Sequence, residues 1–329
     1  MSMLRIGQSE LLISRMGLGC MGMSEFYGPT DDAESLRTLA RARDLGVNFF
    51  DTADMYGHGD NEQLLGKFAK TCRDEIVIAT KFGIVRDQPG SYSRSIENDP
   101  SYIKRACEAS LRRLGVDEID LYYAHRVNPD QPIEETVGAM AELVKEGKVK
   151  AIGLCEVSAD MLSKANSVFP ISAVQTEYSL WTRGPERELL PMCEELNVSL
   201  VAYCPLGRGF LTGRLSGTDD FSTNDFRHSV PRFNGDNLPR NLRTTENVAA
   251  VSRRTGMTQA QVSLNWLLSK HRNVIPIPGT RNIEHLEENV ATLNSTMKMD
   301  DVKELDRAMP IGIAQGERYS DEGMKNVFV

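Results

Sequence analysis

Four residues within the first 125 have side chains that could act together on a proton. Asp51 and Tyr56 lie five positions apart in the stretch "NFFDTADMYGHGDNEQLLG", residues 48–66, where a buried apolar run ends abruptly at a carboxylate. Lys81 and His125 follow the next two apolar runs in the same way. Taken singly, the aspartate could cap a turn, the lysine could be solvated and the histidine could be a core residue. Their equivalent places after consecutive runs favour a shared site.

This grouping suits proton transfer to an oxygen atom. A tyrosine phenol in water has a pKa of about 10, which is too high for efficient proton exchange near neutral pH. An ammonium group nearby favours the phenolate, so we expect Lys81 to lower the pKa of Tyr56. We expect Asp51 to keep Lys81 charged and His125 to orient a substrate oxygen towards Tyr56. Such a site would protonate an oxygen as negative charge develops on it, as carbonyl reduction requires.

Eight short aliphatic or β-branched runs are the elements that would position these residues. They alternate with stretches of helical spacing, which predicts parallel strands joined by right-handed crossovers. Eight such units in 329 residues favour a (β/α)8 TIM barrel, with residues 1–329 as a single domain. The alternative is a doubly wound open sheet, but its glycine-rich fingerprint opens directly into a helix, and no helical spacing starts immediately after residues 17–24. The strand candidates are "RMGLG", "VNFF", "EIVIAT", "EIDLYYA", "VKAIGL", "SAVQT", "VSLVAY" and "NVIPI".

Several segments lie outside this alternation or shape the active-site face of the barrel, which is formed by the C-terminal ends of the strands. Residues 4–14 contain a Gly-x-Ser turn and are predicted to form an N-terminal hairpin that closes the barrel floor. The long insertion at 207–241, the loop at 82–100 and the tail at 310–329 are expected at the active-site face, where they would set substrate specificity. Residues 246–270 have the spacing of one helical stretch.

The composition narrows the class of protein. A net charge of −8 gives no support to a general role on nucleic acids or membrane surfaces. No apolar run reaches the roughly 20 residues of a membrane-spanning helix, and the charged N-terminal stretch lacks the apolar centre of a signal peptide. The six cysteines are scattered without a Cys-x-x-Cys pair, which argues against a zinc site and a disulfide scaffold. We therefore expect a cytoplasmic protein with reduced thiols and no metal.

The spacing Asp-x-x-x-x-Tyr-Gly within residues 51–57 resembles that of the aldo-keto reductases, and the resemblance runs over nearly the whole chain. It implies that Asp51, Tyr56, Lys81 and His125 are the catalytic tetrad, with Tyr56 as the general acid. It also implies an NADP(H) cofactor bound across the barrel mouth without a Rossmann fold. The implied reaction transfers hydride from NADPH to a small aldehyde or ketone, giving an alcohol, and is reversible.

The resemblance further implies which residues contact the cofactor. Gln175 would bond the carboxamide, and the ring of Tyr203 would stack on the nicotinamide. Arg281, at a helix start, suits a 2′-phosphate because a guanidinium and free backbone NH groups both favour an anion. We therefore predict a preference for NADPH over NADH. The remaining implied contacts are Cys20, Met21, Gly22, Asp51, Cys155, Cys204, Pro205, Leu206, Gly207, Gly209, Gly279, Thr280, Glu288 and Asn289.

The chain also departs from the family's common pattern. After the fifth strand, Cys155 replaces a serine and Glu156 occupies the last place of the motif, so anchoring of the carboxamide would depend more on Gln175, because a thiol is a weak donor. Cys204 likewise stands where relatives often have serine, and His285 stands where some have arginine. We favour buried, inert thiols over a redox-sensitive pair.

Three residues after strand ends are candidates for the substrate pocket, namely Tyr27, Phe82 and Arg126. Two other functions are compatible with the same fold. Some aldo-keto reductase relatives are cofactor-sensing subunits of potassium channels, and an unrelated barrel enzyme such as an isomerase would share the architecture but not the implied cofactor residues. The resemblance leaves the oligomeric state open.

Overall fold

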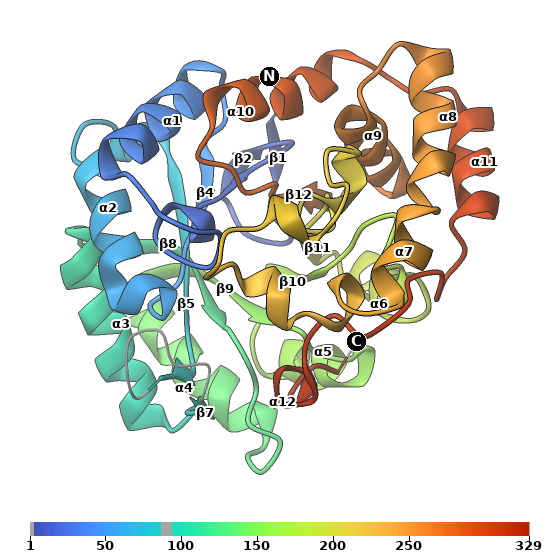
Figure 1. The fold of residues 1–329 in the computed structure, drawn as a ribbon. Coiled ribbons are helices and arrows are strands. Elements are labelled where there is room, and N and C mark those ends of the chain that lie inside the picture. Colours follow the sequence, from blue (N-terminus) through green and yellow to red (C-terminus); the bar gives the residue numbers. More distant parts are fainter. Residues whose placement is uncertain (1–2, 87–93, 329) are drawn as a thin grey trace.

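The computed structural model describes residues 3–86 and 94–328, which form a closed barrel of eight parallel strands (Figure 1). The strand order around the sheet is β12-β11-β10-β9-β8-β5-β4-β3. A parallel bridge between Gly19 and Gly279 and a hydrogen bond from Gly17 N to Pro276 O, 3.0 Å long, join the two ends. The predicted (β/α)8 barrel is therefore confirmed. Its strands are β3 (Leu18–Gly19), β4 (Phe49–Asp51), β5 (Val77–Phe82), β8 (Ile119–Ala124), β9 (Val149–Cys155), β10 (Ala173–Glu177), β11 (Ser199–Tyr203) and β12 (Val274–Pro276).

Alternation along the strands decides which residues face the barrel interior, because successive side chains of a strand point to opposite faces. On β5, Val77 and Ala79 belong to the inner core, whereas Ile78 and Phe82 belong to the core between the sheet and the helices. Lys81 shares the inner parity. The same alternation turns Asp51 of β4 inward, with Phe49 two residues before it in the inner core.

The predicted N-terminal hairpin is also confirmed. Strands β1 (Met3–Arg5) and β2 (Leu12–Ser14) pair antiparallel. Ile6 and Ile13 are fully buried and belong to the same inner core as the barrel residues Phe49 and Ile275. The hairpin therefore closes one end of the barrel and leaves the other end for the site.

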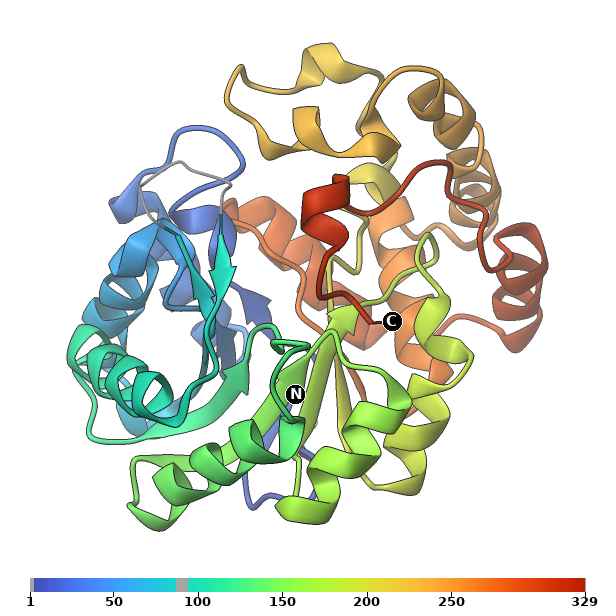
Figure 2. The ribbon, with the colours of Figure 1, turned by 90° about the horizontal axis from the view of Figure 1, so that it is seen from below.

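Helices cover the outside of the barrel between successive strands (Figures 1 and 2). Local signals account for their ends: Asp31 accepts a hydrogen bond from Glu34 N at the start of α1, and Gly115 ends α3 with a φ of 65°. No helix of the described residues is long and apolar enough to cross a membrane. The helices are α1 (Asp32–Asp44), α2 (Asp60–Ala69), α3 (Pro100–Leu114), α4 (Ile133–Lys145), α5 (Ala159–Val168), α6 (Leu189–Glu195), α7 (Asn237–Leu242), α8 (Thr245–Thr255), α9 (Gln259–Lys270), α10 (Ile283–Ala291), α11 (Met299–Ala308) and α12 (Asp321–Met324).

The prediction of one helical stretch over residues 246–270 is wrong, because the structure has two helices there. Helix α8 ends at Gly256, whose φ of 73° is left-handed and suits glycine. Thr258 then begins α9 with a capping box, in which its hydroxyl accepts from Gln261 N and the Gln261 side chain accepts from Thr258 N. The spacing of the apolar residues does not show this break, which is set by the capping residues Gly256 and Thr258.

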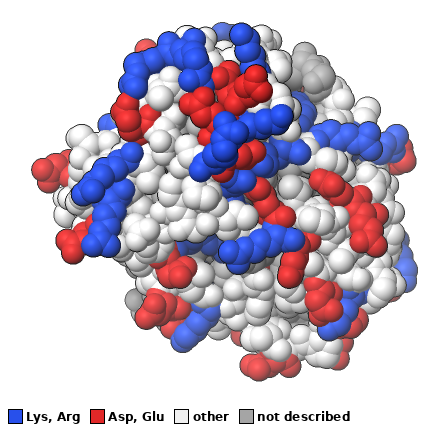
Figure 3. Space-filling view, turned by 90° about the vertical axis from the view of Figure 1, so that its right-hand side faces the viewer, with Lys and Arg blue, Asp and Glu red and all other residues white. Residues whose placement is uncertain are grey.

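The insertion at 207–241 and the C-terminal tail pack against each other on one side of the molecule, as the yellow-to-orange and red segments in Figure 2 show. Arg232 Nε donates to Gly316 O at 3.2 Å, and Asn241 Nδ2 donates to Gln315 O at 2.9 Å. Of the third expected specificity segment, 82–100, the described part contains the strands β6 (Ile84–Val85) and β7 (Ser95–Ile96), and residues 87–93 lie outside the described residues. On the face in Figure 3, charges of both signs are interspersed.

Candidate active site

Asp51 and Lys81 form a buried ion pair at the C-terminal ends of β4 and β5. Lys81 Nζ contacts Asp51 Oδ1 and donates to Thr52 O at 2.6 Å, and neither charged side chain is more than 4% exposed. Burial by itself would lower the pKa of Lys81, but the Asp51 carboxylate raises it above its usual range. Lys81 is therefore an ammonium at neutral pH, held in place by Asp51 and the Thr52 carbonyl.

Tyr56 and His125 complete the cluster that the sequence predicts. Tyr56 begins the short helix η2 (Tyr56–Gly59), and the centre of its ring lies 5.1 Å from Lys81 Nζ. The His125 ring meets the Tyr56 ring edge to face, with centroids 5.8 Å apart. Gly59, with a φ of 98°, allows the tight turn that leads from η2 into α2. All four residues thus lie together at one end of the barrel.

The expectation that the pKa of Tyr56 is lowered is wrong. Burial raises the pKa of Tyr56 above its ordinary value, and Lys81 opposes that rise without reversing it. The phenol is therefore protonated at neutral pH and can donate its proton. Burial also holds the pKa of His125 well below its usual value, and the charges of Lys81 and Arg126 add to this effect. The imidazole is therefore neutral and keeps one N–H donor.

Three residues with implied cofactor roles line the inner face of neighbouring strands. Gln175 of β10 donates from Nε2 to Asp51 Oδ2 at 2.7 Å, so its amide nitrogen also positions the ion pair. Cys155 of β9 is buried in the inner core. The Tyr203 hydroxyl, at the end of β11, donates to Glu156 Oε1 at 2.6 Å and is 2.9 Å from the Tyr319 hydroxyl.

The loop after β11 turns sharply through the residues implied for the diphosphate. Positive φ values occur at Cys204 (47°), Gly207 (57°), Arg208 (58°) and Gly209 (88°). A Cβ on Gly207 would lie 2.9 Å from the Trp181 ring, so a side chain there would be crowded as well as strained. Such a run of turns presents backbone N–H groups to an anion. Pro205 and Leu206 lie within this loop.

The loop after β12 and the loop after β3 contact each other. The Arg281 guanidinium donates to Gly22 O at 3.1 Å and to Tyr27 O at 3.0 Å. In this structure it therefore holds the loop after β3, and these N–H groups are already hydrogen-bonded. Thr280 Oγ1 accepts from Asn282 N at 3.0 Å. Of the other implied residues, Cys20 and Asn289 are buried. Met21 begins the short helix after β3, and Gly279 forms the bridge to Gly19 that closes the barrel. Glu288 is paired with Arg214 at 2.8 Å.

The structure separates the three candidates for the substrate pocket. Phe82 is fully buried on the outer face of β5, where its ring packs 4.9 Å from that of Tyr122. The expectation that Phe82 lines the pocket is therefore wrong, because it is one residue out of phase with Lys81. Tyr27 lies in the loop after β3, and the guanidinium carbon of Arg227 lies over its ring, 5.4 Å from the ring centre. Arg126 lies next to His125 at the mouth.

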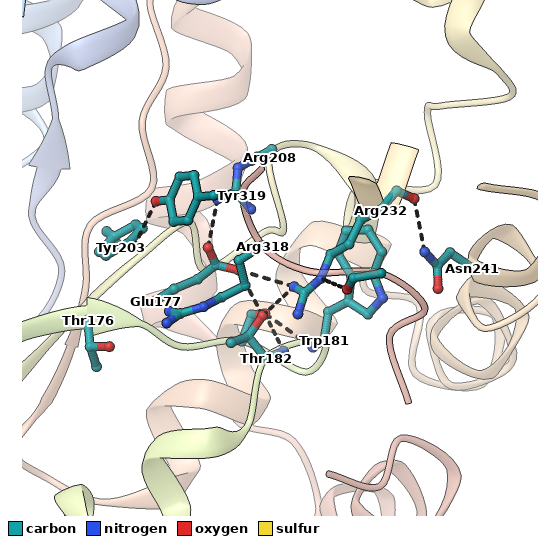
Figure 4. Close-up of polar contacts among 12 residues, drawn as sticks. Thr176, Glu177, Trp181, Thr182, Tyr203, Arg208, Arg232, Asn241, Arg318 and Tyr319 are labelled. Carbon is teal, nitrogen blue, oxygen red and sulfur yellow. Dashed lines mark hydrogen bonds and ion pairs between the residues drawn. The ribbon is translucent and has the colours of Figure 1, made fainter. Parts of the chain in front are cut away.

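Sequence reasoning missed a buried charge network beside the mouth (Figure 4). Glu177 accepts from Arg208 Nη2 at 2.7 Å and from Arg232 Nη1 at 3.2 Å. Arg318 of the tail donates to Glu156 at 3.0 Å. Burial by itself would raise the pKa of Glu177, but the arginines outweigh it and lower the pKa to about 2. One signal in the sequence could have revealed this network: Glu177 lies two residues after Gln175 on the same strand, so its side chain points to the same inner face.

Comparison with known proteins agrees with this geometry. The model of the Aldo/keto reductase family matches residues 15–310. A protein described as "Probable aldo-keto reductase 1", from Glycine max, is 42% identical over 317 residues, which cover 96% of this chain and 91% of that protein. The glycerol dehydrogenase of Gluconobacter oxydans superposes with a TM-score of 0.85 at 26% identity over 93% of this chain and 94% of its own. An aldo-keto reductase from Klebsiella pneumoniae in complex with NADPH superposes with a TM-score of 0.73 at 27% identity, covering 97% and 98% of the two chains.

The chain therefore belongs to the aldo-keto reductase family. It is an oxidoreductase of the class that uses a nicotinamide cofactor.

Proposed function

We propose that this protein is an NADPH-dependent carbonyl reductase that converts an aldehyde or ketone to an alcohol, reversibly. The observation that carries the proposal is the Lys81 ammonium, fixed by Asp51 and lying against the ring of Tyr56, whose other neighbour is a neutral His125. Bound NADPH supplies the hydride. The chain's own task is to bind and orient the carbonyl and to deliver one proton to its oxygen.

The residues present fit a nicotinamide dinucleotide. The sharp turn at 204–209 can present N–H groups to a diphosphate. Tyr203 and Gln175 lie on the adjacent strands β11 and β10 and share the inward parity. Arg281 lies directly before Asn282, the N-cap of α10, where backbone N–H groups favour an anion. We infer that Arg281 exchanges its bonds to the Gly22 and Tyr27 carbonyls for the 2′-phosphate and so gives a preference for NADPH.

Each member of the tetrad has a defined part in the proton transfer. Tyr56 is the general acid, since its phenol is protonated at neutral pH. Lys81 stabilises the phenolate that remains, because its charge lies beside the ring and opposes the effect of burial. The His125 N–H can donate to the carbonyl oxygen and hold it near Tyr56. Asp51 keeps Lys81 charged and in place.

The test is NADPH oxidation, followed by absorbance, with a panel of aldehydes, ketones and pyridoxal. We expect Tyr56→Phe to lower kcat by at least about a hundredfold, the low end of a general acid's contribution. Quenching of protein fluorescence by NADPH should be unchanged in this variant, because Phe keeps the ring. Turnover by Tyr56→Phe at the wild-type rate, or equal kcat/KM with NADH and NADPH, would contradict the corresponding part of the proposal.

A further inference from the structure

Arg126, the residue after His125 at the end of β8, has a buried guanidinium with little to bind. Its side chain is 5% exposed. Nη1 donates to His125 O at 2.6 Å, but Nε is buried without a hydrogen-bond partner. Among residues 3–86 and 94–328, no carboxylate lies within 4.0 Å of this guanidinium. Leaving such a group unpaired is costly, and a bound anion would remove that cost.

The carboxylates of the mouth are already paired with other cations. Asp51 is paired with Lys81 and Glu156 with Arg318. Glu177 is shared by Arg208 and Arg232. Within the described part of the chain, positive charge at the mouth therefore exceeds negative charge, and Arg126 carries part of that excess.

Arg94 adds a second cation of the same kind. Its Nη2 donates to Gly323 O of the tail at 3.0 Å, and no ion pair to a described residue reaches it. Burial lowers the pKa of Arg94, and the charge of Arg126 lowers it further. Both arginines also act on His125, whose pKa they help to lower.

The position of Arg126 separates it from the expected phosphate contacts of the cofactor. In the closed order of strands, β8 stands four places from β12 in either direction, and so lies across the barrel from it. Gly279, Thr280 and Arg281 follow β12, and the 204–209 turn follows β11. An anion at Arg126 would therefore lie beside His125, on the substrate side of the tetrad.

We propose that Arg126 binds an anionic group of the substrate, so that the preferred substrates are carbonyl compounds bearing a carboxylate or a phosphate. This inference rests on the proposed carbonyl reductase function. The planar guanidinium fork matches either anion in a bidentate contact. In the reaction, the carbonyl carbon gains a hydride from NADPH, the oxygen gains a proton from Tyr56, and the anionic group is unchanged.

The experiment compares charged and neutral forms of one aldehyde. The probes are 4-carboxybenzaldehyde, its methyl ester and 4-formylphenyl phosphate, each reduced with NADPH. For the wild-type enzyme we expect kcat/KM to be at least about tenfold higher for an anionic probe than for the ester, the effect of one hydrogen bond to a charged group. The carboxylate and phosphate arms identify which anion is preferred.

Variants then locate the effect. We expect Arg126→Gln to lose at least about tenfold in kcat/KM for the anionic probes, mainly through KM, and less than about threefold for the ester. Arg126→Lys should recover part of the loss because it keeps the charge. Arg112→Gln, which removes an exposed arginine of α3, is the matched control and should change neither value.

The outcomes separate this inference from the proposed function. A wild-type enzyme that reduces the ester as well as the anionic probes overturns the inference and leaves the reductase function standing. An equal loss for all probes in a folded Arg126→Gln also overturns it. If this variant does not fold, the wild-type comparison decides by itself. Reduction of no carbonyl compound by the wild type would contradict the proposed function, and the inference with it.

Discussion

Lys81 and Asp51 each depend on the other for their place in the barrel. Both side chains are withdrawn from water, where an uncompensated charge is costly. Each also has a neutral partner, the Thr52 carbonyl for Lys81 and the Gln175 amide for Asp51. The pair is therefore both a structural element and the source of the charge next to Tyr56, and these two roles can be separated experimentally.

Two variants separate these roles, one that removes only the lysine charge and one that removes both charges of the pair. Lys81→Met leaves Asp51 as an unpaired buried carboxylate, so we expect a loss of about 3–5 kcal/mol in the free energy of unfolding, measured with urea. We also expect at least about a hundredfold loss of kcat.

The double variant Lys81→Met/Asp51→Asn is the control. It removes both charges, so we expect it to recover most of the lost stability while activity stays low. Recovery of activity together with stability would show that the ammonium has no chemical role beside Tyr56.

At the level of the elements, alternation along each strand selects the residues of the site. Asp51, Lys81 and Gln175 share the inward parity of their strands, and Phe82 does not. The sequence predicts the strands and their C-terminal ends well, because buried parallel strands are short apolar runs. It predicts parity less well near a strand end, where one residue of displacement moves a side chain to the other face.

Helix boundaries depend on single capping residues, and α9 provides a test. Thr258→Ala removes the hydroxyl that accepts from Gln261 N, so we expect a loss of about 1 kcal/mol in the free energy of unfolding. Because α9 lies outside the barrel, kcat/KM should be unchanged.

Thr258→Ser is the matched control, since it keeps the hydroxyl and should stay within about 0.5 kcal/mol of the wild type. Equal losses for the alanine and serine variants would mean that the cap does not contribute.

In the whole molecule, buried ion pairs fasten the insertion and the tail to the barrel. Glu177 of β10 accepts from Arg208 and Arg232 of the insertion, and Glu156 after β9 accepts from Arg318 of the tail. Glu177 lies 31 residues from Arg208 and 55 from Arg232 in the chain, and Glu156 lies 162 residues from Arg318. The network holds the loops that bound the mouth.

The pKa of Glu177 gives this network a defined pH dependence. In the folded protein it is lowered to about 2, from 4.5, so the unfolded chain binds the proton more tightly. The stabilisation is therefore complete above about pH 4.5 and is lost as the pH falls from there towards 2. We expect Glu177→Gln to lower the free energy of unfolding by about 3–5 kcal/mol at pH 7 and by clearly less at pH 3.5.

Urea unfolding at pH 7, 5 and 3.5 measures this difference. Glu188→Gln, at an exposed glutamate before α6, is the control and should change stability by less than about 0.5 kcal/mol at each pH. A deficit for Glu177→Gln that stays constant down to pH 3.5 would contradict the assigned pKa.

The barrel, its closing hairpin and the grouping of Asp51, Tyr56, Lys81 and His125 at one end of it can all be predicted from the sequence. These follow from local patterns: the apolar runs, their alternation with helices, and the residue types at the ends of successive strands. The folded structure was needed to show which groups pair with Glu156 and Glu177, that Arg281 holds the loop after β3, and that burial outweighs Lys81 in setting the pKa of Tyr56. Pairing and burial depend on how distant loops pack around each side chain, and no local spacing encodes that environment.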